Sequence, residues 1–147
     1  MIEQIGGRKL GEFECRQMNI VTLAYMGDVV YDLYIRGKVV EKGDQKIHDI
    51  HREVVTFVNA NAQADAVDGL MEELREAEHA IFLRGRNSKS LPTKNTDMAH
   101  YKKATGFESI LGYLYMSGQD ERLMYLLDKA TSMTEGTRSK ANDSAAR

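Results

Sequence analysis

The stretch LAYMGDVVYDLYIR, residues 23–36, places apolar side chains at the three- and four-residue spacing of an amphipathic helix. Asp28 falls on the same expected face as Tyr31 and Ile35. A carboxylate among apolar side chains is unexpected, because an unpaired buried charge is costly. The stretch therefore predicts a helix that packs against the rest of the protein and carries one acid for a specific purpose.

A second stretch, GFESILGYLY at residues 106–115, repeats this pattern, with Glu108 on a largely apolar expected face. Gly27 and Gly112 lie beside the two acidic positions. Glycine within a helix costs about 0.5–1 kcal/mol relative to alanine, and it is often kept where two backbones approach closely. We therefore expect two helices that cross tightly near Asp28 and Glu108.

Two converging carboxylates allow two interpretations. Carboxylate oxygens are ligands that Mg²⁺ prefers, and a bound metal can activate water and stabilise charge on a phosphoryl group. Alternatively, each acid could cap a helix or pair with a nearby lysine or arginine inside the core. Spacing alone leaves both interpretations open.

The remaining patterns predict an all-α protein of one domain, which suits a chain of 147 residues. Apolar periodicity predicts main helices over about residues 18–40, 47–65, 70–83, 98–116 and 120–133, with Asp68-Gly69 breaking the chain before the third. The tail has no apolar period and should be disordered. We therefore expect one folded domain over residues 1–133 and a disordered tail over residues 134–147.

Composition argues against several functional classes. The single cysteine, Cys15, allows neither an intrachain disulfide nor a cysteine metal cluster. No apolar run approaches the ~20 residues of a membrane span, and the first residues contain no apolar signal segment, so we expect a cytoplasmic protein without a membrane partner. Glycine-rich nucleotide-binding motifs are absent, and the histidines lack a matching set of zinc ligands.

Positive charge is concentrated in residues 84–103, which hold six lysines and arginines against Asp97 alone, although the whole chain has a net charge of −2. The part RGRNSKSLPTKNTD, residues 84–97, contains the single proline and reads as a loop. Such a loop could contact the phosphate backbone of duplex RNA, or it could simply be solvated. The candidate RNA contacts are Arg84, Arg86, Asn87, Lys89, Lys94, Lys102 and Lys103, with His51 and Arg52 on the second predicted helix.

LAYMGDVVYDLYIR, RGRNSKS…PTKNTD, YKKATGFES and GFESILGYLY occur in this order over roughly residues 18–128 and together resemble mini-ribonuclease III. That family keeps the ribonuclease III catalytic domain and lacks the double-stranded-RNA-binding domain. The resemblance implies that residues 1–133 are a ribonuclease III-like catalytic domain with the ribonuclease III endonuclease-domain fold, as a helical homodimer. It implies endonucleolytic hydrolysis of double-stranded RNA that depends on Mg²⁺, with Mn²⁺ as a substitute, and leaves 5′-phosphate and 3′-hydroxyl ends.

The resemblance also implies site residues and partners. Asp28 and Glu108 fall on the family's catalytic acids, which hold the metal while an activated water attacks the phosphodiester. The implied substrate is the 23S ribosomal RNA precursor, with a ribosomal protein or an assembly intermediate as a further partner.

Two positions depart from full-length ribonuclease III, because Ala24 and Thr105 stand where that enzyme has a glutamate and an aspartate. Mini-ribonuclease III shows the same reduction, so water and RNA phosphate oxygens would complete the coordination of Mg²⁺. Two alternatives remain open. One is a non-catalytic RNA-binding or ribosome-assembly module, which needs the basic loop but not the acids. The other is a helical adaptor between proteins.

Overall fold

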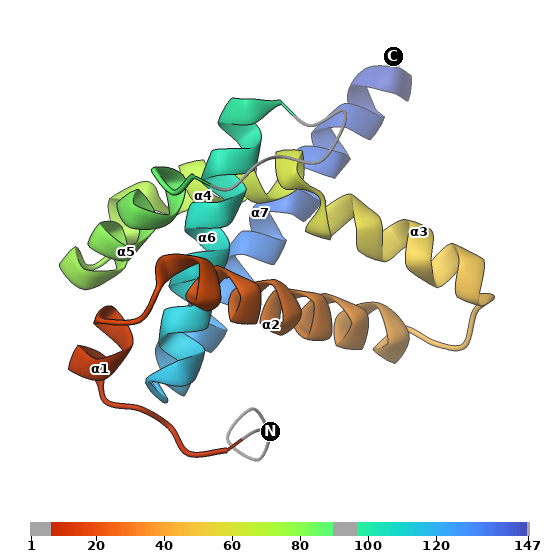
Figure 1. Cartoon of the computed structure of the whole chain (residues 1–147). Helices are drawn as coiled ribbons and strands as arrows, with labels where there is room; N and C mark the ends of the chain where they lie inside the picture. The colour runs from red at the N-terminus through yellow and green to blue at the C-terminus, as the bar shows by residue number, and fades with distance from the viewer. Residues whose placement is uncertain (1–6, 90–96, 147) are drawn as a thin grey trace.

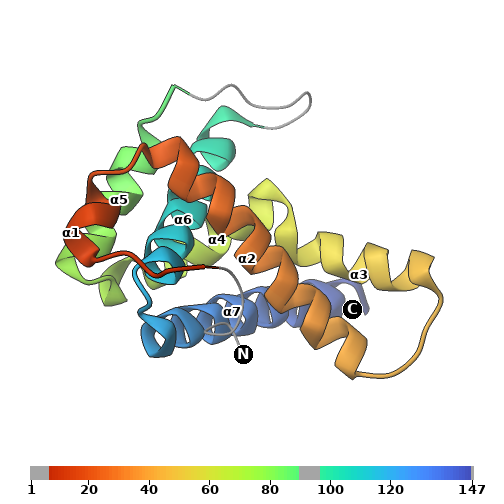
Figure 2. The same ribbon diagram turned by 60° about the horizontal axis from the view of Figure 1, so that its bottom comes forward.

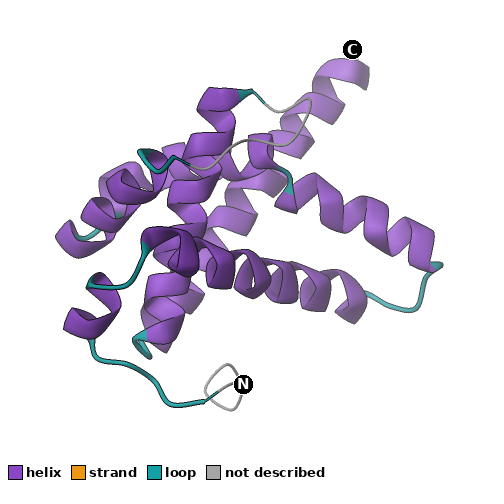
Figure 3. Cartoon of the chain, in the orientation of Figure 1, coloured by secondary structure: helices purple, strands orange, loops and turns teal. Residues whose placement is uncertain are grey.

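A computed structural model describes the backbone of residues 7–89 and 97–146, and the side chains as far as residue 138. The described residues form helices and contain no strand, which confirms the predicted all-α class (Figures 1, 2 and 3). The helices are α1 (Glu12–Arg16), α2 (Ile20–Glu41), α3 (Ile47–Val58), α4 (Ala60–Leu70), α5 (Glu76–Arg86), α6 (Met98–Met116) and α7 (Asp120–Ala146), with a 3₁₀ turn η2 at Met71–Glu73.

Helix α6 runs through the centre of the molecule, and α2, α4, α5 and α7 pack around it (Figures 1 and 2). Every residue of α6 from 104 to 115 is buried except Glu108. A helix that is apolar on all sides is typical of a position inside the core. On one side the ring of Phe107 meets Tyr31 of α2 edge-on, with 5.2 Å between the ring centroids. The burial pattern therefore singles out Glu108 as the one position where the central helix reaches the surface of the core.

The single helix expected over residues 47–65 is instead two helices, α3 and α4. Asn59 separates them because its backbone is extended and its side-chain oxygen accepts a hydrogen bond of 2.8 Å from the amide of Ala62. Asparagine is a favoured N-cap, so this residue ends one helix and begins the next. The break expected at Asp68-Gly69 is absent, because Gly69 stays inside α4 and packs closely against the Met133 side chain of α7.

Helix α5 begins at Glu76, later than the expected start at residue 70, and a buried ion pair fixes this start. Glu78 accepts hydrogen bonds of 2.9 Å from Arg122 Nε and Nη2 and a third from the amide of Arg75. Burial opposes ionisation of Glu78, but the bonds from Arg122 outweigh it and hold the pKa of Glu78 below its usual value. Arg122 also donates to the backbone oxygen of Glu73, so the pair ties α7 to η2 and α5.

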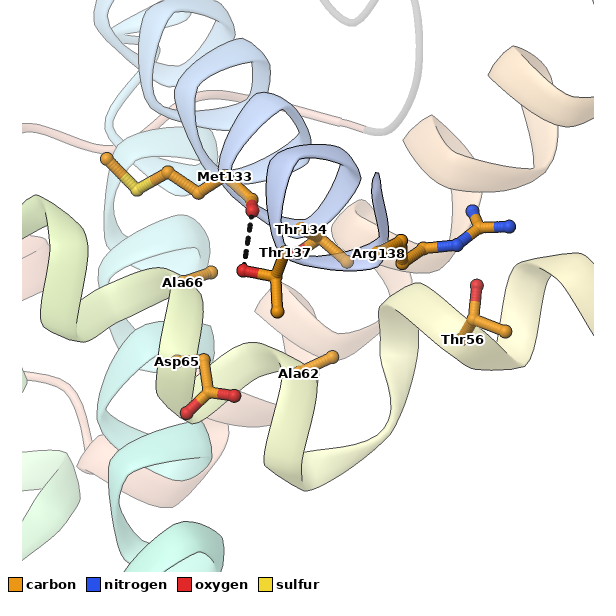
Figure 4. Close-up of a pocket in the computed structure, with 8 residues that line it drawn as sticks. All are labelled: Thr56, Ala62, Asp65, Ala66, Met133, Thr134, Thr137 and Arg138. Carbon is orange, nitrogen blue, oxygen red and sulfur yellow. Dashed lines mark hydrogen bonds between the residues drawn. The ribbon is translucent and has the colours of Figure 1, made fainter. Parts of the chain in front are cut away.

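Helix α7 continues to Ala146, which corrects the disordered tail predicted from residue 134 and places the expected domain boundary inside a helix. Thr134 is buried, and the Arg138 guanidinium lies 5.2 Å from the centre of the Phe57 ring. Figure 4 shows this part of α7 facing α3 and α4 across a pocket of about 190 Å³. The lining residues are Thr56, Ala62, Asp65, Ala66, Met133, Thr134, Thr137 and Arg138. Because threonines and an arginine stem make this contact, a search for apolar periodicity misses it.

Two further features complete the architecture. Helix α1 was not predicted, and it is anchored by Cys15, whose side chain is fully buried. Burial raises the pKa of the Cys15 thiol, which disfavours a reactive thiolate there. None of the helices in the described ranges combines the length and the apolar content that a membrane crossing requires.

Candidate active site

Helices α2 and α6 cross with their backbones in direct contact, as the two glycines predicted. A Cβ atom on Gly27 would overlap the carbonyl oxygen of Glu108, and a Cβ atom on Gly112 would overlap the carbonyl oxygen of Leu23. Any residue other than glycine at either position would therefore force the helices apart. This contact brings the residue after Gly27, which is Asp28, next to Glu108.

The two carboxyl groups meet at this crossing and share a hydrogen bond. Glu108 is half-buried, whereas Asp28 is exposed. Burial first, and then the negative charge of Asp28 and the hydrogen bond to it, raise the pKa of Glu108 to about 9. In the metal-free protein at neutral pH, the raised pKa favours the protonated form of Glu108.

The inward-looking position expected for Asp28 is wrong. Helix α2 carries apolar residues on two sides, and only one of these faces the core. The other side is exposed and forms a stripe at four-residue spacing, which we call the α2 stripe: Val21, Tyr25, Val29 and Leu33. Periodicity identified the helix, but it could not show which apolar side is buried. Asp28 lies at the edge of the exposed side, where a ligand can reach it.

Internal ion pairing of the two acids, the alternative left open by the sequence, finds no support in the described residues. None of the ion pairs found there includes Asp28 or Glu108. The next charged residue along α2 after Asp28 is Asp32, and its carboxylate pairs with Arg36 at 3.0 Å. The only partner identified for Glu108 is thus another acid, an arrangement that a bound cation would stabilise.

The donor set fits a hard divalent cation. Two carboxylates on adjoining helices offer oxygen ligands, as Mg²⁺ prefers, and one of them is accessible from outside. The described residues contain no group of three or more histidine, cysteine or acidic side chains that could hold a metal. Ala24 and Thr105 are both buried, and the Thr105 hydroxyl donates to the backbone oxygen of Tyr101 at 3.0 Å. Water and substrate oxygens would therefore fill most of the coordination sphere.

Several of the predicted RNA contacts have partners within the protein. The Lys103 ammonium lies 3.0 Å from a carboxylate oxygen of Asp68, and Arg52 Nη2 lies 2.8 Å from His48 Nε2. Arg84 donates to the backbone carbonyl groups of Arg16, at the end of α1, and of Met18, just before α2. These three side chains are less available for phosphate than the sequence suggested, and that information was not contained in residue type or spacing.

Apart from Arg84 and Lys103, the predicted contacts fall in two places. A first group lies at the end of α5 and the start of α6: Arg86, Asn87, Lys89 and Lys102. His51 and Arg52 lie on α3, which packs beside the C-terminal half of α2, on the other side of α6 from α5 (Figures 1 and 2). The structure does not bring these two sets together within one chain, and Lys94 lies outside the described residues.

The sequence is similar to known proteins over the part of the chain that builds this crossing. A family model described as the ribonuclease III domain matches residues 21–119, which include both acids. The Mini-ribonuclease 3 of Thermoanaerobacter sp. is 44% identical over 116 residues, covering 78% of this chain and 82% of the relative. The Mini-ribonuclease 3 of Symbiobacterium thermophilum is 41% identical, covering 78% of this chain and 89% of the relative.

The fold has a solved counterpart as well. A crystal structure of a Fusobacterium nucleatum protein superposes with a TM-score of 0.72 at 27% identity, covering 80% of this chain and 94% of the other. The sequence similarity and the helical architecture indicate the same family, and the matched region includes both acids. The chain belongs to the ribonuclease III family and is similar throughout its matched region to the mini-ribonucleases III.

Proposed function

We propose that Asp28 and Glu108 hold the Mg²⁺ ion with which this chain, an endoribonuclease of the ribonuclease III type, hydrolyses double-stranded RNA. The observation that carries the proposal is the crossing of α2 and α6, where two acids share a hydrogen bond and have no cationic partner among the described residues. Mn²⁺ could replace Mg²⁺, because both accept carboxylate and water oxygens.

The two acids have different tasks in this proposal. Asp28 is exposed, so it would be the metal ligand on the side open to the RNA. Glu108 would be the second metal ligand, and a cation bound there would favour its ionised form. The chemistry that a metal bound by these two acids would supply is activation of a water nucleophile and neutralisation of charge at the phosphorus centre. Attack by water on the phosphodiester would leave 5′-phosphate and 3′-hydroxyl ends.

Binding of the duplex would rest on the cations at the end of α5 and the start of α6, since the mini-ribonuclease III family has no separate RNA-binding domain. Arg86, Lys89 and Lys102 are the candidates, together with Asn87, and Lys94 remains a prediction. A second copy of the chain would pack against the α2 stripe, and the RNA would lie across this interface. Exposed apolar surface of this kind marks protein contacts.

The biological setting is a proposal from the resemblance rather than from geometry. The substrate would be the 23S ribosomal RNA precursor in the cytoplasm, in contact with a ribosomal protein or an assembly intermediate. Mapping the ends produced from a pre-ribosomal duplex by the purified protein, with and without Mg²⁺, would test the substrate and the metal in one experiment.

The site itself is tested by Asp28→Asn, with Asp32→Asn as the matched control one helical turn away. We expect Asp28→Asn to lower the cleavage rate of a perfect duplex by about 10²-fold or more, because it removes a metal ligand while preserving size. Asp32→Asn should cleave normally, and both variants should keep the helical circular-dichroism spectrum. Wild-type cleavage by Asp28→Asn would reject the proposal. Duplex binding by the wild type without product at any Mg²⁺ concentration would indicate a non-catalytic binding module.

A further inference from the structure

The side chain of Arg84 connects two parts of the chain that are far apart in sequence. Arg84 lies in the last turn of α5, where its Nη1 donates to the backbone oxygen of Arg16 at 2.8 Å and its Nη2 donates to that of Met18 at 3.0 Å. Arg16 is the last residue of α1, and Met18 precedes Asn19, the N-cap of α2. The guanidinium group thus joins the end of α5 to the start of the helix that carries Asp28.

The next residue, Gly85, fixes the end of α5 from the other side. A Cβ atom at Gly85 would lie 2.5 Å from Ser109 Oγ and 2.9 Å from the Cα of Gly106. Gly106 and Ser109 lie on either side of Glu108 in the sequence of α6. The last turn of α5 is therefore held between the α6 segment that contains Glu108 and the segment that leads into α2.

This turn is also where the basic segment leaves the helix. Asn87 is the C-cap of α5, and Arg86 and Lys89 lie on either side of it. The direction in which these side chains leave the protein depends on how the last turn of α5 is fixed. The two anchors are the start of α2 and the part of α6 that contains Glu108. They therefore fix the position of the basic residues relative to both proposed metal ligands.

We propose that Arg84 is a positioning residue for RNA cleavage and not an RNA contact. Its planar fork donates to the two carbonyl groups from two separate nitrogens held in fixed directions, a geometry that the single ammonium nitrogen of lysine does not reproduce. A phosphate bound at the same edge of the guanidinium would break both bonds. The proposal rests on the function proposed above. In this proposal, Arg84 fixes the position of the last turn of α5, where the RNA-contacting segment begins, relative to the metal site.

The expected effect is on the cleavage step. Misplacement of a reacting group by about 1 Å can lower a rate by about 10²-fold. Arg84 is exposed, so water can replace its hydrogen bonds and the fold should persist. We expect Arg84→Ala and Arg84→Lys each to lower the single-turnover rate at saturating duplex by about tenfold, because alanine loses both hydrogen bonds and lysine loses the rigid two-nitrogen fork that places them.

Salt dependence separates positioning from phosphate contact. The logarithm of duplex affinity falls with the logarithm of salt concentration, with a slope of about −0.9 for each phosphate contact. Binding is measured by fluorescence anisotropy of a labelled duplex, in an Asp28→Asn background that prevents cleavage. We expect Arg84→Ala to keep the wild-type slope, whereas Lys89→Ala, a matched loss of one charge from the exposed start of the same segment, should make the slope shallower. Amide hydrogen exchange over residues 16–20 should be faster in both Arg84 variants.

Three results would overturn the assignment: a slope that becomes shallower by about one contact in Arg84→Ala, a wild-type cleavage rate in Arg84→Lys, or unchanged hydrogen exchange over residues 16–20. Failure of the proposed function would look different, because the wild-type protein itself would then not cut a duplex at any Mg²⁺ concentration, whether or not it bound one. Even in that case, the hydrogen-exchange measurement would still show whether Arg84 anchors the start of α2.

Discussion

At the scale of a single residue, the ionised form of Glu108 that a metal site needs is the form that destabilises the fold. Its folded pKa of about 9 lies above the ordinary value of 4.5, chiefly because of burial and then because of Asp28. The folded protein therefore holds this proton more tightly than the unfolded chain does. The resulting stabilisation is complete below about pH 4.5 and is lost as the pH rises towards 9, unless a cation replaces the proton.

This conflict predicts the behaviour of Glu108→Gln, which keeps the shape of the side chain and cannot ionise. In chelator at pH 8, the thermal midpoint of this variant should exceed that of the wild type by several degrees, because 1 kcal/mol shifts the midpoint of a domain of this size by roughly 2–4 °C. At pH 5 the difference should shrink. Added Mg²⁺ should raise the midpoint of the wild type but not of the variant. Differential scanning fluorimetry measures all of these, and a variant less stable than the wild type at pH 8 would contradict the pKa argument.

The crossing of α2 and α6 is the element-scale feature on which the site depends, and Gly27 is its most sensitive position. A methyl group at Gly27 would overlap the Glu108 carbonyl, so Gly27→Ala should lower the free energy of unfolding by about 3 kcal/mol or more. Gly136→Ala on α7 is the control, since nothing lies within 4 Å of the added carbon. It should raise stability by about 0.5–1 kcal/mol. Urea titration would measure both, and destabilisation by Gly136→Ala would contradict a helix at that position.

The elements also show which features can be predicted from sequence. Acids and glycines paired in two motifs predicted the tight crossing, because glycine in a helix has a cost that needs a reason. The helix break at Asn59 was missed, since apolar spacing continues on both sides of it. The pairing of Glu78 with Arg122, and the hold of Arg84 on the start of α2, could not be predicted because they join residues far apart in sequence. Local patterns therefore gave the elements, whereas the contacts that lock the elements together required the structure.

At the scale of the whole molecule, the α2 stripe is the feature that a single copy of the chain leaves unexplained. Tyr25 is 73% exposed and Val29 is 56% exposed, on the same helix and beside Asp28. A small protein does not normally leave such a row of apolar side chains in water. A two-fold pairing of identical chains would cover each stripe with the other, as closed homodimers do. It would also place two metal sites near one interface, which would suit cleavage of both strands of a duplex.

This arrangement predicts that a charge in the stripe separates the copies without unfolding them. In sedimentation equilibrium, the wild type should have twice the 16.6 kDa mass of one chain, and Tyr25→Glu should have the mass of one. Because the Tyr25 side chain is mostly exposed in one copy, the variant should keep its helical spectrum. Met124→Glu, which places the same charge at a partly exposed apolar residue of α7, should remain a dimer. Cleavage should fall in Tyr25→Glu alone, because its duplex would no longer lie across two subunits. A wild-type protein with the mass of one chain, or a Tyr25→Glu protein that stays paired, would show that the stripe serves another contact.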